Sequence, residues 1–260
     1  MEGTSKDLYL EERRQEIVKF INSTGRVSVA ELAERFSVSE VTVRSDLQAL
    51  ASRNLIIRTH GGAVSSSHGS HELSLSIRSQ QQVLEKDRIG LAAAALVSDD
   101  NAINLDSTTT ALAIARHLRR RRGLTILTNS IAIAYEMLEA PGVTVVMPGG
   151  TVHRDVGSLI GATGLEPLQE FNIQKGFFGA YGLSLPEGLT DVSLPEVEIK
   201  RKLVGMCHEV IAVLDSTKWG RFGLASFAAP ETISRVITDA RAPRDLVEQV
   251  QAIGIQVDFV

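Results

Sequence analysis

The feature that most constrains the fold is an alternation, from residue 86 to the C-terminus, of short apolar runs with amphipathic segments. The apolar runs predict strands at 102–106, 124–129, 143–150, 176–182, 210–215, 235–240 and 255–260. Helices are expected between most of them, notably at 109–121, 130–139, 194–207 and 243–253. Strands that alternate with helices form a mostly parallel sheet covered on both faces. The sequence therefore predicts a large α/β domain over residues 81–260.

The first 63 residues follow another pattern, with three short amphipathic segments and then an extended one. The first helix is expected to stop near Gly25, and the second to begin at Ser28, where Ser28 and Glu31 can form a capping box. Ser39 is a natural N-cap for the third helix. The extended stretch 56–60 then runs into a Gly-Gly pair that can turn back as a hairpin. Residues 1–63 are therefore predicted to form a winged helix-turn-helix.

The third helix is expected to turn Val43, Leu47 and Leu50 inward, which leaves its polar face outward. In a winged helix-turn-helix such a face enters the major groove, and the wing reaches the backbone or the minor groove. The candidate DNA-binding residues are Ser39, Val41, Thr42, Arg44, Ser45, Gln48, Arg58, His60, Gly61 and Gly62. From the pattern alone, the three helices could also be a protein-interaction module.

Residues 64–80 are predicted to link the two domains, because the stretch 65–72 is small, polar and free of apolar periodicity. A flexible linker of about a dozen residues spans roughly 20 Å. That slack would let two DNA-binding domains reach neighbouring half-sites from a common dimeric core.

Polar and small residues follow five of the expected strands, at the edge where parallel sheets bind ligands. Hydroxyls and backbone N–H groups at a helix start suit an anion such as phosphate, and glycines let a ligand approach the backbone. The candidate ligand-binding residues are Lys86, Asp106, Ser107, Thr108, Thr109, Thr110, Thr128, Asn129, Gly149, Gly150, Tyr181, Lys200, Asp215 and Lys218. Together they predict a pocket for phosphate and a polyol.

Composition excludes several other classes. The six histidines show no metal-ligand spacing, and a single cysteine excludes an internal disulfide framework and a cysteine-based zinc finger. No cofactor or metal is therefore expected. The N-terminus has no signal-peptide pattern, and the longest apolar run, 91–97, is too short to cross a bilayer. A cytoplasmic protein without a membrane partner is expected. The net charge of −4 makes DNA binding depend on local arrangement.

The strings VSEVTVRSDLQAL and LIIRTHGGAV resemble the signature of the DeoR family of bacterial regulators. Positions that match are Val38, Ser39, Thr42, Val43, Arg44, Asp46, Leu47, Arg58, His60, Gly61, Gly62 and Ala63. Many members carry a second arginine where this chain has Ser45, so one phosphate contact would be lost there. The resemblance continues through EKDRIG, LDSTTT, LTNS, Gly149–Gly150, Gly161, GAYG, the Glu196–Arg201 run and DSTKWGR.

The resemblance implies a C-terminal domain similar to ribose-5-phosphate isomerase that binds a phosphorylated sugar as effector. It further implies a repressor of carbohydrate metabolism genes, which binds a double-stranded DNA operator as a homodimer or higher even oligomer. Two positions depart: Thr108 stands where members commonly have Gly, and Tyr181 where they commonly have an acid. A tyrosine is a poor base at neutral pH, so no enzymatic activity is expected.

Two alternatives remain open at this point. One is a sugar-phosphate isomerase or deaminase with a DNA-binding appendage, which Tyr181 disfavours. The other is an architectural DNA binder without a ligand, which the polar strand ends disfavour.

Overall fold

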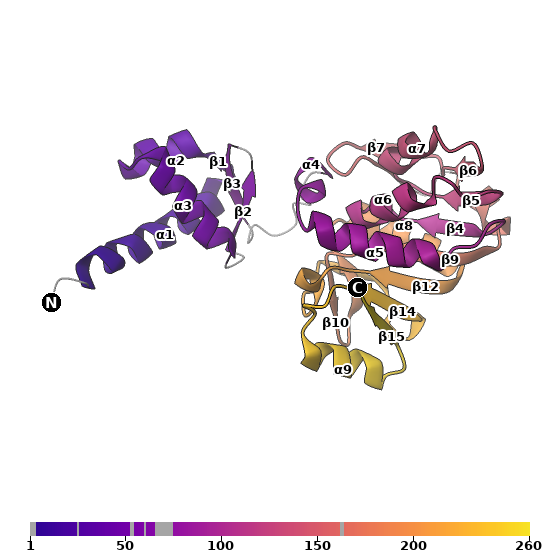
Figure 1. Ribbon diagram of the computed structural model, residues 1–260. Helices are drawn as coiled ribbons and strands as arrows, with labels where there is room; N and C mark the ends of the chain where they lie inside the picture. The colour runs from indigo at the N-terminus through magenta and orange to yellow at the C-terminus, as the bar shows by residue number, and fades with distance from the viewer. Residues whose placement is uncertain (1–3, 25, 53–54, 60, 66–74, 162–163) are drawn as a thin grey trace. The chain divides into compact units, whose positions relative to one another are not determined.

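The computed structural model describes residues 4–24, 26–52, 55–59, 61–65, 75–161 and 164–260. Contacts divide the chain into two compact units, Met1–Gly69 and Ser70–Val260 (Figure 1). Within the described residues, no helix is long and apolar enough to cross a membrane.

The first unit is a winged helix-turn-helix, as expected. Its helices and strands are α1 (Thr4–Thr24), β1 (Arg26–Ser28), α2 (Val29–Phe36), α3 (Glu40–Ser52), β2 (Ile56–Thr59) and β3 (Gly62–Ser65). The strands form an antiparallel sheet in the order β1-β3-β2, so the wing gains a third strand that the sequence did not predict. Both sides of the predicted capping box are made, between Ser28 and Glu31, and α3 buries Val43, Leu47 and Leu50.

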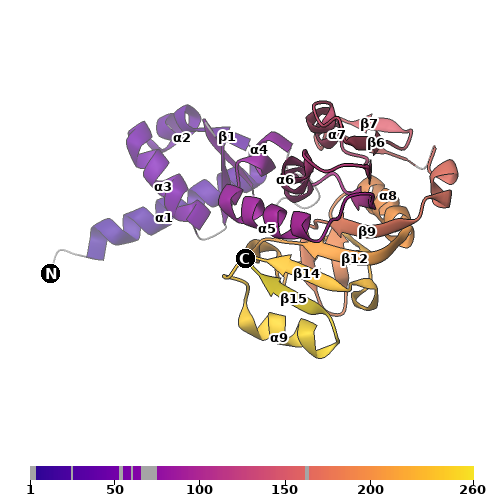
Figure 2. The same cartoon turned by 45° about the vertical axis from the view of Figure 1, so that its right-hand side comes forward.

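The second unit is built on a seven-stranded parallel sheet, and all seven expected strands are present. They are β4 (Ala102–Leu105), β5 (Leu124–Leu127), β6 (Val143–Val146), β9 (Ile173–Phe178), β12 (Cys207–Val213), β14 (Arg235–Thr238) and β15 (Gln256–Phe259). The spatial order is β15-β14-β12-β9-β4-β5-β6, and every neighbouring pair is parallel (Figure 1). Figure 2 shows β9, β12, β14 and β15 in this order. The strand order reverses between β4 and β9, which places a topological switch point at their carboxyl ends.

Helices cover both faces of this sheet. One hydrophobic core lies under α5 (Val83–Ala95), α6 (Thr109–Leu118) and α7 (Ile131–Met137), and a second lies under α8 (Leu194–Gly205) and α9 (Arg244–Ala252). The sequence did not predict α5. The predicted helix 194–207 ends two residues early, because Cys207 begins β12.

The sequence analysis also did not predict several short antiparallel strands. The hairpin β7 (Thr151–His153) and β8 (Ser158–Ile160) follows β6, and a second sheet joins β10 (Gly182–Ser184), β11 (Gly188–Asp191) and β13 (Ala225–Ala228). The predicted strand 176–182 is therefore two strands, β9 and the start of β10. Strands of three or four residues are too short to show an apolar period.

The segment 64–80, expected as a linker, contains regular structure. It holds the end of β3 and the helix α4 (Leu75–Ser79), and its residues 66–74 lie outside the described part of the chain. Helix α4 is held to the second unit, since the N–H of Leu75 donates to the carbonyl of Asp155 at 2.8 Å.

Candidate functional site

The outward face of α3 carries most of the predicted DNA-binding residues. Val41 is 73% exposed, and the Arg44 side chain is 54% exposed with its Nη2 2.6 Å from Oε2 of Glu40. The hydroxyl of Ser39 accepts the N–H of Thr42 at 3.2 Å, which confirms Ser39 as the N-cap of this helix. Ser45 and Gln48 are also exposed, whereas Thr42 is half-buried. Of the predicted DNA-binding residues on α3, Val41, Arg44, Ser45 and Gln48 are therefore exposed.

The wing is tied to this helix. Arg58 on β2 donates a hydrogen bond to the side-chain oxygen of Gln48 on α3. Gly61 is exposed and its carbonyl accepts the N–H of Val29 at 2.8 Å. Gly62 is buried, and a Cβ there would lie 1.9 Å from the carbonyl oxygen of Val27. Gly62 therefore shapes the wing by letting β1 and β3 approach each other closely. His60, which was also predicted to bind DNA, lies outside the described residues.

A buried carboxylate fixes α3 against α1. The side chain of Asp46 is 1% exposed and accepts hydrogen bonds from Nε of Arg13 at 2.7 Å and Nε of Arg14 at 2.9 Å. The sequence analysis treated Asp46 only as a position of family resemblance. Its partners lie more than 30 residues away in sequence, so no local pattern could have found them.

In the second unit, Asp106 stands at the switch point. Its carboxylate is fully buried and accepts the N–H of Thr108 at 3.0 Å, the hydroxyl of Thr108 at 2.6 Å and the N–H of Gly179 at 2.9 Å. A Cβ on Gly179 would lie 2.6 Å from Oγ1 of Thr108, so glycine is needed where β9 ends beside the start of α6. Asp106 thus joins the ends of β4 and β9.

Lys200 completes a buried ion-pair group. Its Nζ lies 3.2 Å from Oδ2 of Asp106 and 2.8 Å from Oδ2 of Asp191, and it donates to the carbonyl of Gly179 at 3.0 Å. Burial lowers the pKa of Lys200, but the carboxylates of Asp191 and Asp106 outweigh it and hold the pKa above its ordinary value. Lys200 and Asp106 were both predicted as ligand residues, and the structure instead joins them to each other.

A second polar group surrounds Glu196, which is fully buried. Its carboxylate accepts the hydroxyls of Ser107, at 2.9 Å, and of Ser158. Nδ1 of His153 lies 3.5 Å from Oε1 of Glu196. The β7–β8 hairpin supplies Ser158 and His153, and because the sequence analysis did not predict that hairpin, it missed both residues.

Asn129 adds an amide beside the same hairpin. It follows β5, is fully buried and donates from Nδ2 to the carbonyl of Leu159 at 3.2 Å. Its Oδ1 has no hydrogen-bond partner among the described residues. We call Ser107, Asn129, His153, Ser158 and Glu196 the polar cluster. Their side chains can donate hydrogen bonds to sugar hydroxyls and accept hydrogen bonds from them.

Cations gather at the end of β12. Burial lowers the pKa of Lys86 to about 8, with Lys218 and Arg78 contributing and Asp215 opposing. Burial also lowers the pKa of Lys218, again opposed by Asp215 and reinforced by Arg221 and Arg78. These four cations and Asp215 are named here the cationic cluster. Positive charges held together near buried strand ends are suited to an anion.

The other predicted ligand residues have local roles. Tyr181 is half-buried, with the guanidinium of Arg221 4.2 Å from its ring centre. Thr109 and Thr110 are buried in the first turn of α6, and the hydroxyl of Thr128 accepts the N–H of Ser130 at 3.1 Å. Gly149 and Gly150 are exposed, and a Cβ on Gly150 would lie 2.4 Å from the carbonyl oxygen of Ile160.

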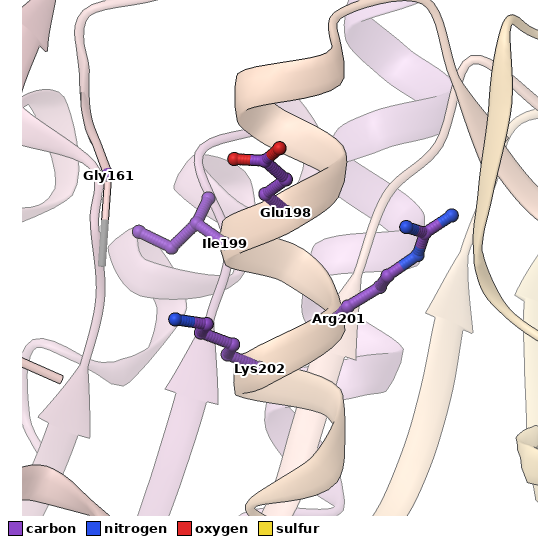
Figure 3. A pocket seen from close by; sticks show the side chains of 5 residues that line it. All are labelled: Gly161, Glu198, Ile199, Arg201 and Lys202. Carbon is purple, nitrogen blue, oxygen red and sulfur yellow. The ribbon is translucent and has the colours of Figure 1, made fainter. Parts of the chain in front are cut away.

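A cavity of about 330 Å³ lies elsewhere, along α8. Figure 3 shows its lining residues, Gly161, Glu198, Ile199, Arg201 and Lys202. None of them belongs to the cationic cluster or to the polar cluster. Among the described residues, no group of three or more acidic, histidine or cysteine side chains could hold a metal ion.

Family models match both units. The DeoR C terminal sensor domain matches residues 81–240, and the DeoR-like helix-turn-helix domain matches residues 13–68. The HTH-type transcriptional regulator GolR of Listeria innocua is 32% identical over 246 residues, covering 95% of this chain and 97% of GolR. The glycerol-3-phosphate regulon repressor of Escherichia coli is 30% identical, covering 95% and 98%. The transcriptional repressor GlcR of Bacillus subtilis is 30% identical, covering 96% of each chain.

Solved structures overlap the chain only in part. Ribose 5-phosphate isomerase A of Methanocaldococcus jannaschii is 16% identical with a TM-score of 0.39, covering 52% of this chain and 53% of its own. The eIF2B delta subunit of Chaetomium thermophilum is 13% identical with a TM-score of 0.43, covering 62% and 57%. An isomerase and an initiation factor overlap the chain to a similar extent, so no activity follows from this overlap.

Proposed function

Since this chain belongs to the DeoR family of transcriptional regulators, we propose that it is a repressor of carbohydrate metabolism genes controlled by a phosphorylated sugar or sugar alcohol. The first unit binds a double-stranded operator, and the second unit senses the effector. The relatives that are named as repressors of the glycerol-3-phosphate regulon and as GlcR support this reading.

The observation that carries the DNA-binding half is the exposed face of α3. Arg44 reaches outward from the first turns of a capped helix, where a guanidinium can bond a guanine or a phosphate. Glu40 holds that guanidinium in the absence of DNA and would release it to the stronger field of the duplex. Ser39, Val41, Ser45 and Gln48 line the same face, and Arg58 with Gly61 extends it onto the wing.

The effector site is assigned to the strand ends. The cationic cluster would take the phosphate, with Lys86 and Lys218 as its direct partners. The polar cluster would bind the hydroxyls of the sugar through Ser107, Asn129 and Glu196. In this assignment Asp106 and Lys200 support the site from beneath and do not touch the effector.

The regulator works without turnover of its effector in this proposal. Tyr181 follows β9 with its ring beneath Arg221, and a tyrosine is a poor general base at neutral pH. We further propose a homodimer or higher even oligomer in the cytoplasm, because twofold symmetry lets two α3 helices read two half-sites.

The test has two arms. Selection from random duplexes defines the operator, and fluorescence anisotropy then compares wild-type protein with Arg44→Ala and with Arg120→Ala, a control on an exposed residue after α6. Arg44→Ala should weaken operator binding by about 1–3 kcal/mol, or roughly 5- to 150-fold, and relax specificity at one base pair. Equal affinities of the two variants would refute the assigned DNA face.

In the second arm, thermal unfolding is recorded with triose, pentose and hexose phosphates, with their sugar alcohol phosphates and with the unphosphorylated parents. A ligand that binds only the folded protein raises the unfolding temperature. A phosphorylated compound should do so and its parent should not. If no phosphorylated compound stabilises the protein, the sensing half of the proposal fails.

A further inference from the structure

The strands of the β7–β8 hairpin contribute two side chains to the polar cluster. His153 on β7 and Ser158 on β8 are paired directly across the hairpin, where opposite residues share one face. The hydroxyl of Ser158 donates to Oε1 of Glu196, and Nδ1 of His153 lies 3.5 Å from the same oxygen. The base of the hairpin is therefore held against α8 through Glu196.

The turn of the same hairpin contacts the start of α4. The N–H of Leu75 donates to the carbonyl of Asp155 at 2.8 Å, and a Cβ on Gly157 would lie 3.3 Å from Cδ2 of Leu75. The N–H of Gly157 also donates to the carbonyl of His153 at 2.9 Å, which ties the turn to β7. Leu75 is the first described residue after 66–74, on the side of the second unit. The hairpin therefore joins the polar cluster to the segment by which the chain continues from the first unit.

His153 and Glu196 are spaced to bind one hydroxyl between them. Nδ1 of His153 is buried and has no hydrogen-bond partner within the part of the chain that the structure describes. The facing carboxylate favours a proton on this nitrogen. Because a hydroxyl both donates and accepts, one whose oxygen lies about 2.8 Å from each atom would accept from Nδ1 and donate to Oε1 of Glu196. A sugar hydroxyl can therefore join the two side chains.

Asn129 is an independent indication that the polar cluster binds a hydroxyl. Its backbone carbonyl accepts the N–H of Leu159 on β8 at 2.8 Å, and its Nδ2 donates to the carbonyl of Leu159 at 3.2 Å. Its side chain is fully buried, and Oδ1 finds no hydrogen-bond partner among the described residues. A buried acceptor in that state is unfavourable, and a donor from a ligand would satisfy it.

We propose that the β7–β8 hairpin couples effector binding to the first unit, with His153 as the residue that senses a hydroxyl of the effector. The hydroxyl draws His153 towards Glu196 and tightens the hairpin, so that its turn holds Leu75 more firmly. This inference rests on the proposed sugar-phosphate effector and assigns the response to its hydroxyls, whereas the phosphate supplies affinity. By thermodynamic linkage, whatever fixes the hairpin also strengthens the binding of the effector.

The experiment uses the full-length protein with ribose 5-phosphate, glucose 6-phosphate, glycerol 3-phosphate and inorganic phosphate. Calorimetry measures binding of each compound, and fluorescence anisotropy measures operator affinity with and without it. A sugar or sugar alcohol phosphate that binds should change operator affinity about fivefold or more. Hydrogen–deuterium exchange in residues 75–79 should slow with the same compound. Inorganic phosphate should produce neither effect, and an equal response to it would overturn the inference.

Variants of His153 separate its hydrogen bond from its packing. His153→Phe keeps a ring without nitrogens and should bind the compound roughly 2- to 10-fold more weakly, with no change of operator affinity on binding. His153→Asn, whose amide can donate near the position of Nδ1, should restore part of the response. His208→Phe makes the same change on an exposed histidine of β12 and should behave as wild type.

The outcomes distinguish this inference from the proposed function. Equal results for His153→Phe and His153→Asn, in binding and in control of operator affinity, would overturn the role of Nδ1 while the proposed function stands. Leu75→Ala should bind the compound as wild type does and show a smaller response, and an undiminished response would remove the turn from the coupling. If none of the phosphorylated compounds binds the wild-type protein, the proposed function and this inference fall together.

Discussion

Lys86 carries its charge where burial works against it, and its pKa of about 8 lies below the ordinary lysine value. Below pH 8 the ammonium is charged and can bind phosphate; above pH 8 the folded protein releases the proton. Binding of the phosphorylated effector should therefore weaken between pH 8 and 9.5, approaching tenfold per pH unit if the charge is essential. Calorimetric titration from pH 7 to 9.5 measures this decline.

Lys86→Arg is the control for that profile, because a guanidinium stays charged over the whole range. Its affinity should decline less between pH 8 and 9.5 than that of the wild type, because only Lys218 of the two proposed phosphate partners can then lose its proton. The same lysine makes folding more favourable as pH rises from 8 towards 10.5, since the unfolded chain then binds more protons than the folded one. An identical loss of binding in Lys86→Arg would assign the pH dependence to another group.

Asp46 is the buried charge on which the first unit depends. Asp46→Asn leaves Arg13 and Arg14 without their carboxylate and should lower the free energy of unfolding by about 3 kcal/mol, the lower end for a broken buried pair because both arginines keep some exposure. Urea titration, with hydrogen exchange of α3 as the probe, measures the loss. Glu16→Gln, which breaks an exposed pair with Lys19, should cost about 1 kcal/mol or less. Similar losses for both variants would contradict a special role for Asp46.

The wing depends on the close approach of β1 and β3. Gly62→Ala would place a methyl group 1.9 Å from the carbonyl oxygen of Val27, so the strands must separate and operator binding should fall by about tenfold or more. Gly205→Ala, in the second unit, meets no atom within 4 Å and is the matched control. Anisotropy on the operator compares the two variants. A Gly62→Ala protein that binds as tightly as Gly205→Ala would remove the wing from the interface.

Helix α8 brings two functional side chains to the strand ends. Glu196 and Lys200 are four residues apart and therefore share one face. That face is buried, so the acid bonds hydroxyls near β4 and β8 while the lysine bonds Asp106 and Asp191. A single helix thus contributes Glu196 to the polar cluster and Lys200 to the buried ion pairs with Asp106 and Asp191.

In the proposed function the two units form a linked system, in which effector and operator each change the binding of the other. The coupling free energy expected for such regulators is about 1–3 kcal/mol, or a factor of 5 to 150 in affinity. Linkage requires that the factor by which effector changes operator affinity equals the factor by which operator changes effector affinity. Titrations in both directions, at one protein concentration, test this. Unequal factors would mean that a further equilibrium, such as a change of oligomer, takes part.

The sequence by itself determined the seven strands of the parallel sheet and the helices α6, α7, α8 and α9 of the larger unit, but not α4, α5 or the short antiparallel strands. A parallel strand buried on both faces is mostly apolar, and the helices that cover the sheet are amphipathic. Both patterns can therefore be recognised from the local sequence. The caps of α2 and α3 were equally readable, because Ser28, Glu31 and Ser39 act within three residues. The outward face of α3 followed from the helical period.

Only the tertiary structure decided the order of the strands and the partners of the polar residues. The sequence analysis assigned Asp106, Lys86, Lys200 and Lys218 to one ligand site. The fold pairs Asp106 with Lys200, whereas the charge of Arg78 lies close enough to Lys86 and Lys218 to lower the pKa of both. Ser107 meets Glu196 across 89 residues of chain, and Lys86 meets Arg78 across a turn that no period marks. Contacts of this kind depend on how packed elements meet in space, which the local spacing of residues does not encode.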